Sequence, residues 1–255
     1  MRLAIVSIFL LTLAPFAASA QSASGDIAAG DREYAALRAE AALASYERAL
    51  AAEPDNFEAL WKASRSALDL ASGPVPSSDR RTQLFQAGER YARRALALRP
   101  GDAEGHFALA RALGKSSQTL GTRAKIKAAT EIRNRALECA RLNPRHSGCH
   151  HILGVWNGEV MRLGSFERVI ARNFLGGRAL GAASWANAQR YLEQAVALAP
   201  GRIVHHLELG DVYRDRGNTV AARKEYEAVL RLPIADYNDE RYKAQAEAAL
   251  RVLPK

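Results

Sequence analysis

The stretch LELGDVYRDRGNTVAARKEYEAVLRLP (residues 207–233) predicts two antiparallel helices joined by a tight turn. Small residues at Gly210 and Ala222 allow the two helix backbones to approach closely. Larger side chains fill the space between the helices: Leu209, Tyr213 and Tyr226. The Gly-Asn pair at 217–218 supplies the turn, because both residue types tolerate positive φ. Proline cannot continue a helix interior, so Pro233 ends the second helix.

Four further runs end in a proline in the same way, which indicates a repeated unit. They are YERALAAEP (46–54), YARRALALRP (91–100), ALECARLNP (136–144) and YLEQAVALAP (191–200). Units that bury their apolar faces only against their neighbours stack into a one-dimensional array. The sequence therefore predicts an all-α fold, an α-solenoid of helical hairpins. The L-G-x-x-Y, A-x-x-x-Y and proline marks resemble the tetratricopeptide repeat.

The spacing of the closing prolines departs from the simple 34-residue repeat. Pro144 and Pro200 are 56 residues apart. Apolar residues within 158–187 recur at helical spacing, which predicts an inserted helix in the third repeat. The last segment, 239–253, has an apolar stripe and predicts a C-terminal capping helix, which the end of a solenoid requires.

Several segments resemble the regulator of microtubule dynamics family. They are LWKASRSALDLA (60–71), HHILGVWNGEV (150–160), LGSFERVIARNFLGG (163–177) and ASWANAQRYLEQAVALAP (183–200). The resemblance covers about residues 33–253. It implies the same solenoid fold and a non-enzymatic, interaction-type role.

Residues 1–20 have the pattern of a secretory signal peptide, with a short basic start, an apolar core (3–14) and a small-x-small site that ends at Ala20. An uncleaved N-terminal anchor is the alternative. We expect cleavage after Ala20, a flexible lead-in at residues 21–30 and one solenoid domain at residues 31–255. The mature chain is then expected in the periplasm or outside the cell, without a transmembrane span.

The first helices of the repeats are predicted to line a concave groove. Trp61, Phe107 and His151 share one register position when the repeats are aligned on their closing prolines. Offsets of three and four residues keep neighbouring side chains on the same helical face. The predicted partner-binding residues are Glu58, Trp61, Arg65, Glu104, Phe107, Arg111 and His151. Aromatic residues flanked by arginines suit a peptide with apolar and acidic groups. Alternatively, these aromatics simply pack against neighbouring helices.

The charge of the chain is concentrated in one hairpin. The whole sequence has a formal net charge of +9. Residues 111–145 contain nine basic and two acidic side chains. The predicted basic patch consists of Lys115, Arg123, Lys125, Lys127, Arg133 and Arg135. Such a patch attracts anionic lipid, polymer or peptide; a solvated arginine-rich helix face is the alternative. Without a nucleic-acid recognition motif, we expect no nucleic-acid partner.

Cys139 and Cys149 lie five residues on either side of Pro144. Antiparallel helix arms would bring them within disulfide distance, and export would favour their oxidation. Alternatively, Cys139 is only the small residue that its register position requires.

His146, Cys149 and His150 could offer metal ligands from one helical turn. Because no fourth ligand is evident, we expect no metal and no cofactor.

Three histidines share another register position, six residues after a closing proline: His106, His150 and His206. We expect them to be packing residues with a ring nitrogen bonded to the backbone.

The sequence has no hydrolase, zinc-protease or complete phosphate-loop motif, so we expect no enzyme. It predicts an interaction scaffold of the cell envelope that binds a peptide or protein in the concave groove. One alternative is a peripheral module that binds anionic lipid or polymer through hairpin 111–145. A metal- or redox-linked protein is the other.

Overall fold

The computed structural model describes residues 14–74, 77–117, 120–164 and 177–254, and these residues are predominantly helical. The first five α-helices are α1 (Ala14–Ala35), α2 (Ala39–Ala52), α3 (Phe57–Ser72), α4 (Ser78–Leu98) and α5 (Ala103–Ser116). The next are α6 (Thr122–Leu142), α7 (Ser147–Arg162), α9 (Trp185–Leu198), α10 (Ile203–Asp215), α11 (Thr219–Arg231) and α12 (Asp239–Val252). A short 3-10 helix, η2 (Arg178–Ala182), precedes α9. The described residues contain no strand, which confirms the all-α prediction.

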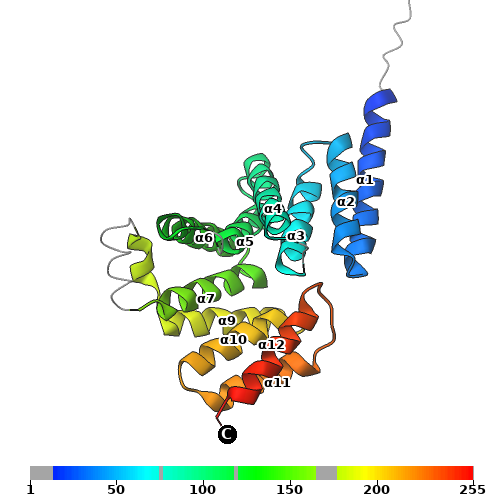
Figure 1. Cartoon of the computed structure of the whole chain (residues 1–255). Coiled ribbons are helices and arrows are strands. Elements are labelled where there is room, and N and C mark those ends of the chain that lie inside the picture. The colour runs from blue at the N-terminus through cyan, green and yellow to red at the C-terminus, as the bar shows by residue number, and fades with distance from the viewer. Residues whose placement is uncertain (1–13, 75–76, 118–119, 165–176, 255) are drawn as a thin grey trace, which may run out of the picture.

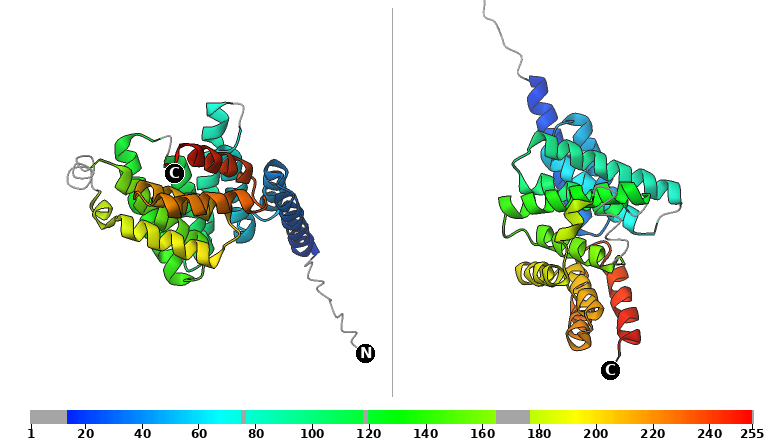
Figure 2. Two further views of the ribbon diagram at one scale, coloured as in Figure 1. Left: turned by 90° about the horizontal axis from the view of Figure 1, so that it is seen from below. Right: turned by 90° about the vertical axis from the view of Figure 1, so that its left-hand side faces the viewer.

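Consecutive helices pair into hairpins that stack along the chain. The pairs are α1 with α2, α3 with α4, α5 with α6, α7 with α9, and α10 with α11. Figure 1 shows this order from the N-terminal to the C-terminal hairpin, and Figure 2 shows the stack from two further sides. The predicted α-solenoid is confirmed. The apolar residues 166–175, for which the sequence predicts an inserted helix, lie outside the described residues.

A small residue on one helix faces a large one on its partner. Gly210 of α10 faces Tyr226 of α11, and a Cβ atom at position 210 would lie 2.7 Å from Tyr226 Cε1. Gly154 of α7 faces Leu192 of α9 in the same way. Tyr226 and Leu192 are fully buried. The close backbone approach predicted from the small residues is therefore present in both hairpins.

The expectation of a flexible lead-in at residues 21–30 is wrong, because this segment is part of helix α1. Ala23 and Ile27 of α1 are buried in the main core cluster. Gly30 faces the ring of Tyr46 on α2. The first repeat is thus a complete helical hairpin formed by α1 and α2.

The first hairpin repeats the residue spacing of the last one. The matching glycine, turn residue and tyrosine are Gly30, Leu37 and Tyr46 in the first, and Gly210, Gly217 and Tyr226 in the last. Gly217 has a φ of 77°, so the turn predicted at this glycine is confirmed. Leu37 has a φ of 60°, in the left-handed region that favours glycine. A leucine at this position conceals the turn from sequence analysis.

The register histidines bond to the backbone as expected. Their Nε2 atoms lie 2.9, 2.8 and 2.9 Å from a proline carbonyl oxygen, in the pairs His106–Pro100, His150–Pro144 and His206–Pro200. Each ring nitrogen donates to a carbonyl that the helix end would otherwise leave unpaired. These histidines consequently fix the connection between one repeat and the next.

The C-terminal segment turns back onto an early helix. Helix α12 packs against α10 and α11, which confirms the predicted cap. Just before α12, Asn238 Nδ2 lies 3.3 Å from both the backbone oxygen and Oδ1 of Asp69 on α3. Figure 1 shows the linking segment reaching toward α3. Within the described ranges, no helix combines the length and apolar character needed to cross a membrane.

Replacing Gly210 by alanine should destabilise the chain by roughly 1–3 kcal/mol, because the added methyl group meets the buried Tyr226 ring. Gly114→Ala is the matched control. Gly114 also lies inside a helix, but a Cβ atom there would meet no described atom within 4 Å beyond its chain neighbours and its own helix backbone. This control should gain roughly 0.5–1 kcal/mol from the better helix propensity of alanine. Urea unfolding followed by circular dichroism measures both changes; equal stabilities would contradict the packing account.

Candidate partner-binding surface

Three of the predicted groove residues lie together on α3, beside α1. The Arg65 guanidinium carbon lies 3.5 Å from the centroid of the Tyr34 ring and 5.2 Å from that of Trp61. Trp61 is half-buried, with its ring against the core. Glu58 is exposed and forms an ion pair of 2.5 Å with Lys62. The α3 set thus combines an accessible aromatic surface with charges of both signs.

A hollow of about 360 Å³ opens beside this α3 set. It is lined from α1 by Ile27 and Asp31, and from the start of α3 by Asn56 and Glu58. Lys62 Nζ lies 2.6 Å from Asp31 Oδ2 and joins the two walls. The α1–α3 face, defined by Asp31, Tyr34, Glu58, Trp61 and Arg65, therefore offers both a hollow and exposed polar groups.

The equivalent residues on α5 make contacts within the protein. Glu104 Oε2 lies 3.2 Å from His146 Nε2. The Phe107 ring lies against the same histidine, with the two centroids 4.6 Å apart. Arg111 forms a 2.6 Å ion pair with Asp69 on α3. These three side chains thus connect neighbouring repeats.

Asp69 is a central acceptor that sequence reasoning missed. Its carboxylate, almost fully buried, accepts from Tyr34 Oη at 3.0 Å and from Arg111 at 2.6 Å, and Asn238 also bonds to it. Burial raises the pKa of Tyr34, and the charge of Asp69 raises it further. Burial acts to lower the pKa of Arg111, but Asp69 and other nearby groups hold it above its ordinary value. An aspartate inside the apolar run LDLA (68–71) is the sequence signal that could have identified it.

His151 packs against another histidine. Its Nδ1 lies 3.1 Å from Nδ1 of His205, so one ring donates to the other, and the ring centroids are 4.8 Å apart. Burial, followed by the nearby His205, lowers the pKa of His151 well below its ordinary value. Burial and then Arg202 lower the pKa of His205 to about 3. The two rings are therefore neutral near pH 7 and join α7 to α10.

Lys115 does not belong with the exposed cations of the predicted basic patch. It lies half-buried on α5, where burial lowers the pKa of its amine and Arg111 lowers it further. Glu208 of α10 is also half-buried; burial and then Asp211 raise the pKa of its carboxyl group to about 7. The inner face of the array thus holds ionisable groups in poorly solvated surroundings.

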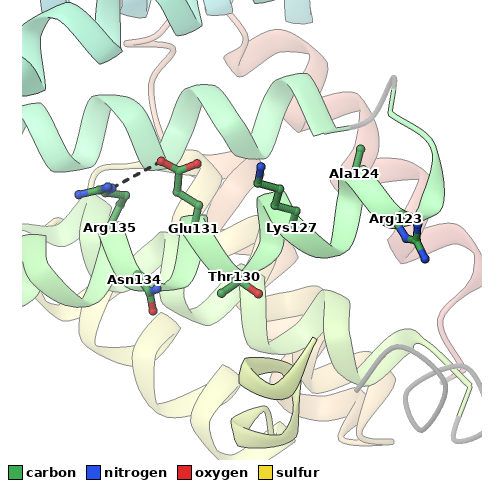
Figure 3. Close-up of a pocket in the computed structure, with 7 residues that line it drawn as sticks. All are labelled: Arg123, Ala124, Lys127, Thr130, Glu131, Asn134 and Arg135. Atoms are coloured by element: carbon green, nitrogen blue, oxygen red, sulfur yellow. Dashed lines mark ion pairs between the residues drawn. The ribbon is translucent and has the colours of Figure 1, made fainter. Parts of the chain in front are cut away.

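The other predicted cations divide into two sets along α6. Arg123, Lys125 and Lys127 are exposed in its first turns, and none of them has an ion pair among the described residues. Figure 3 shows Arg123 and Lys127 beside an open hollow of about 730 Å³. By contrast, Arg135 pairs with Glu131 at 3.7 Å, and Arg133 lies 5.6 Å from the centroid of the Trp156 ring.

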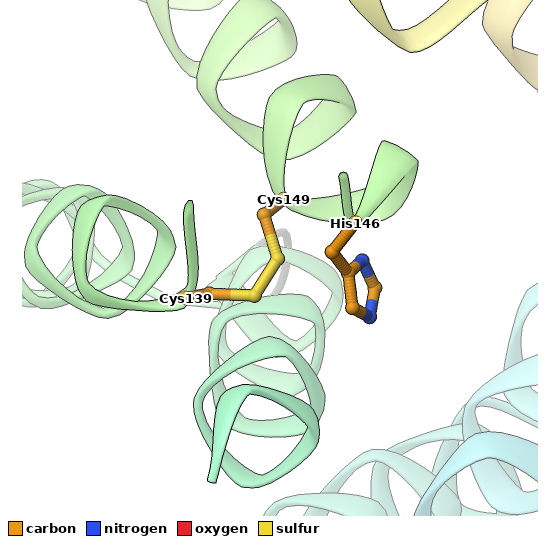
Figure 4. Close-up of side chains that lie close together, drawn as sticks. All are labelled: Cys139, His146 and Cys149. Carbon is orange, nitrogen blue, oxygen red and sulfur yellow. A yellow bond between two sulfur atoms is a disulfide. The ribbon is translucent and has the colours of Figure 1, made fainter. Parts of the chain in front are cut away.

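Cys139 and Cys149 are joined by a disulfide, with their Cα atoms 5.9 Å apart. Figure 4 shows His146 beside the two sulfur atoms. The metal-ligand set considered from the sequence included His150, but this residue bonds to the Pro144 carbonyl. Cys139 takes its place: one ligand atom from each of Cys139, His146 and Cys149 lies within 4.8 Å of the others.

The chain matches the family model described as regulator of microtubule dynamics protein 1-3 over residues 26–254. The chain belongs to this family. Regulator of microtubule dynamics protein 1 of Bos taurus is 28% identical over 120 residues, and that of Mus musculus is 25% identical over 120 residues. The aligned part is 47% of this chain and 38% of the bovine protein, so the chain spans well under half of these relatives.

Solved structures show the same fold. A thermophilic TPR protein of Thermus thermophilus is 21% identical with a TM-score of 0.62, and the match covers 90% of this chain and 100% of that one. The Pseudomonas aeruginosa pilF structure is 16% identical with a TM-score of 0.54 and covers 92% of each chain. These likenesses establish the tetratricopeptide fold. Family and fold together support an interaction scaffold in general terms.

Because the pKa of Glu208 is raised in the folded chain, the free energy of unfolding is expected to depend on pH. Between its unfolded pKa of 4.5 and its folded pKa of about 7, the folded chain holds the extra proton, so the free energy of unfolding falls as pH rises. Glu208→Gln removes this titration. Its stability relative to the parent should therefore rise across this window, by at most roughly 3 kcal/mol. Urea unfolding of both proteins at pH 5 and pH 8 measures the effect; a difference independent of pH would contradict it.

Proposed function

We propose that the chain is a non-enzymatic scaffold that binds a peptide or protein partner on its α1–α3 face. The half-buried Trp61 carries this proposal, together with Arg65 beside it and the hollow next to Glu58. Large aromatic residues and arginines contribute most of the binding energy in protein interfaces. Trp61 and Arg65 lie on the same helix as Glu58, which lines the hollow, and this grouping supports the face as the binding surface.

The remainder of the predicted groove is less suited to a partner. Glu104 and Phe107 contact His146, Arg111 pairs with Asp69, and His151 contacts His205. A partner on these residues would have to replace existing hydrogen bonds, and leaving one buried polar group unpaired costs about 1–3 kcal/mol. We therefore centre the proposed contact on the half-buried Trp61 ring, with Glu58 and Arg65 beside it on α3 and Asp31 and Tyr34 on α1, although Glu58, Asp31 and Tyr34 also bond within the protein.

The chemistry of this face indicates what the partner carries. An apolar side chain would cover Trp61, and a carboxylate would pair with the Arg65 guanidinium at its edge. Lys62 is already paired with Asp31 and Glu58. A basic group of the partner would then be drawn to the exposed Glu58. We propose a short peptide or helix with apolar and acidic groups as the ligand.

The proposed location is the periplasm or the outside of the cell. The signal-peptide pattern of residues 1–20 supports this location. The two buried apolar residues of α1 whose side chains the structure describes, Ala23 and Ile27, follow the predicted cleavage site at Ala20, so cleavage would leave them in place. Sequencing the N-terminus of the mature chain tests this assignment.

The microtubule activity in the name of the relatives is not part of the proposal, because the match covers 38% of the bovine protein.

Trp61→Ala should weaken partner binding roughly tenfold or more, because it removes the central aromatic surface. The measurement is quantitative capture of partners by a C-terminally tagged full chain, produced in its own cells. Trp185→Ala is the matched control, because Trp185 is also half-buried but lies on α9. A partner retained by the control and lost by Trp61→Ala supports the α1–α3 face. Equal capture by both variants, at equal helicity, would refute it.

A second candidate function is favoured by the exposed cations at the start of α6, which form no ion pair within the described part of the chain. Arg123, Lys125 and Lys127 flank a helix N-terminus that has no side-chain cap, where the helix dipole also favours an anion. We propose that this surface holds an anionic lipid headgroup in the hollow of Figure 3. A peripheral contact of this kind could operate alongside partner binding on α1 and α3.

Lys125→Ser/Lys127→Ser should weaken binding to phosphatidylserine-containing vesicles by roughly tenfold or more, because each lysine near the surface contributes about 1 kcal/mol. The control Lys224→Ser/Arg251→Ser removes two exposed cations elsewhere and should bind like the parent. Vesicle sedimentation at low salt and at about 0.5 M salt measures this, and salt should abolish binding. Equal binding to purely phosphatidylcholine vesicles would exclude the lipid proposal.

A further inference from the structure

Cys139, His146 and Cys149 converge at the turn between α6 and α7. Cys139 lies in the last turn of α6, His146 directly precedes α7, and Cys149 lies in the first turn of α7. Both cysteines are fully buried. One ligand atom of each residue lies within 4.8 Å of the others, and Figure 4 shows the three side chains close together. Thiolate sulfur and imidazole nitrogen are ligands that Zn²⁺ prefers.

The histidine has a nitrogen available for a metal. His146 Nε2 is engaged by Glu104 at 3.2 Å, whereas Nδ1 is buried and has no hydrogen-bond partner among the residues that the structure describes. A buried polar atom without a partner costs free energy and calls for an explanation. Because Nε2 is occupied by the carboxylate, Nδ1 is the atom that can coordinate a metal ion.

In two other repeats the residue at the position of His146 caps a helix, whereas Arg202, at the same position after Pro200, makes no cap bond. Two residues after a closing proline, Asn56 Oδ1 accepts from the Ala59 amide at 3.0 Å, and Asp102 Oδ1 accepts from the Glu104 amide at 2.8 Å. Both side chains cap a helix N-terminus. His146 makes no such cap bond. Its side chain therefore does not serve the local capping function, which typically stabilises a helix by about 1 kcal/mol.

Neighbouring residues hold the His146 ring in place. Phe107 lies against it, and Glu104 bonds to its outer nitrogen. Gly148 leaves the necessary space, because a Cβ atom there would collide with the Phe107 ring and lie 3.0 Å from His146 Cε1. A carboxylate that orients a histidine toward a metal is the usual arrangement around protein metal centres. Glu104 would act here as such a positioning residue.

We propose that the reduced chain binds one Zn²⁺ ion through Cys139 Sγ, Cys149 Sγ and His146 Nδ1, and that disulfide formation excludes the metal. A dithiol reductant gives two electrons and two protons to the disulfide, forming two thiols, and is itself oxidised to a disulfide. Zn²⁺ then displaces the two thiol protons as it binds both sulfurs. In the described part of the chain no fourth His, Cys, Asp or Glu joins the cluster, which leaves one coordination position for water or a partner's donor.

The test uses the full chain, stripped of metal and prepared in oxidised and phosphine-reduced forms. Zinc is titrated in competition with a chromophoric chelator. We expect one Zn²⁺ per reduced chain and none per oxidised chain. Cys139→Ala/Cys149→Ala should bind none in either form. Alanine suits both positions, because Ala49 and Ala59 occupy their equivalents in another repeat and are fully buried. Zinc should also slow alkylation of the two thiols in the reduced parent, which provides a readout without any variant.

Two further variants separate coordination from a structural effect. His146→Ala should weaken zinc binding at least about tenfold, and Glu104→Gln by about 10- to 100-fold. His106→Ala is the control, because His106 makes the backbone bond of its repeat but lies outside the cluster. A reduced chain that binds no zinc would overturn the proposal. So would zinc bound equally by the double-alanine variant. Neither result bears on partner binding at Trp61.

Discussion

The close approach of the two helices in each hairpin is the constraint on which the rest of the structure depends. Gly30, Gly154 and Gly210 each leave the space that a large side chain of the facing helix occupies. Protein interiors are packed to crystal-like density, so this fit permits little sliding or rotation between the helices. Each hairpin then presents one fixed surface to the next hairpin. Because the same contact is repeated from hairpin to hairpin, the hairpins form a stack. Equivalent positions of the first helices consequently gather on one inner face.

On that inner face, a single carboxylate connects parts of the chain that the repeat pattern does not place together. Asp69 of α3 accepts from Tyr34 of α1, from Arg111 of α5 and from Asn238 before α12. Each donor would be left in poorly solvated surroundings without this acceptor, which is costly. The return of the C-terminal segment to α3 is therefore specific. It also engages Arg111, which is one reason why we place the proposed binding surface on α1 and α3.

The local parts of the fold could be predicted from the sequence, because they rest on contacts between nearby residues. Pro200, Gly210 and Gly217 mark helix ends, close packing and a turn by properties of single residue types. Helix α1 was missed because Leu37 stands where the last repeat has a glycine. The contacts of the groove residues could not be predicted, since their partners are remote in the sequence: Arg111 and its partner Asp69 are 42 residues apart. The periodicity of the sequence identifies residues that share one face of a helix, but it does not identify the distant residues that pack against that face.

Departures from the repeat are more informative about function than the repeat itself. At the turn around Pro144, three positions depart together from their equivalents near Pro54: Cys139 for Ala49, His146 for Asn56, and Cys149 for Ala59. A disulfide alone accounts for the two cysteines. It does not account for a histidine that makes no helix cap and keeps a buried nitrogen unpaired beside the sulfurs. A metal site that requires both thiolates and the imidazole accounts for all three substitutions by one mechanism, and it gives Glu104 and Phe107 a reason to contact that ring.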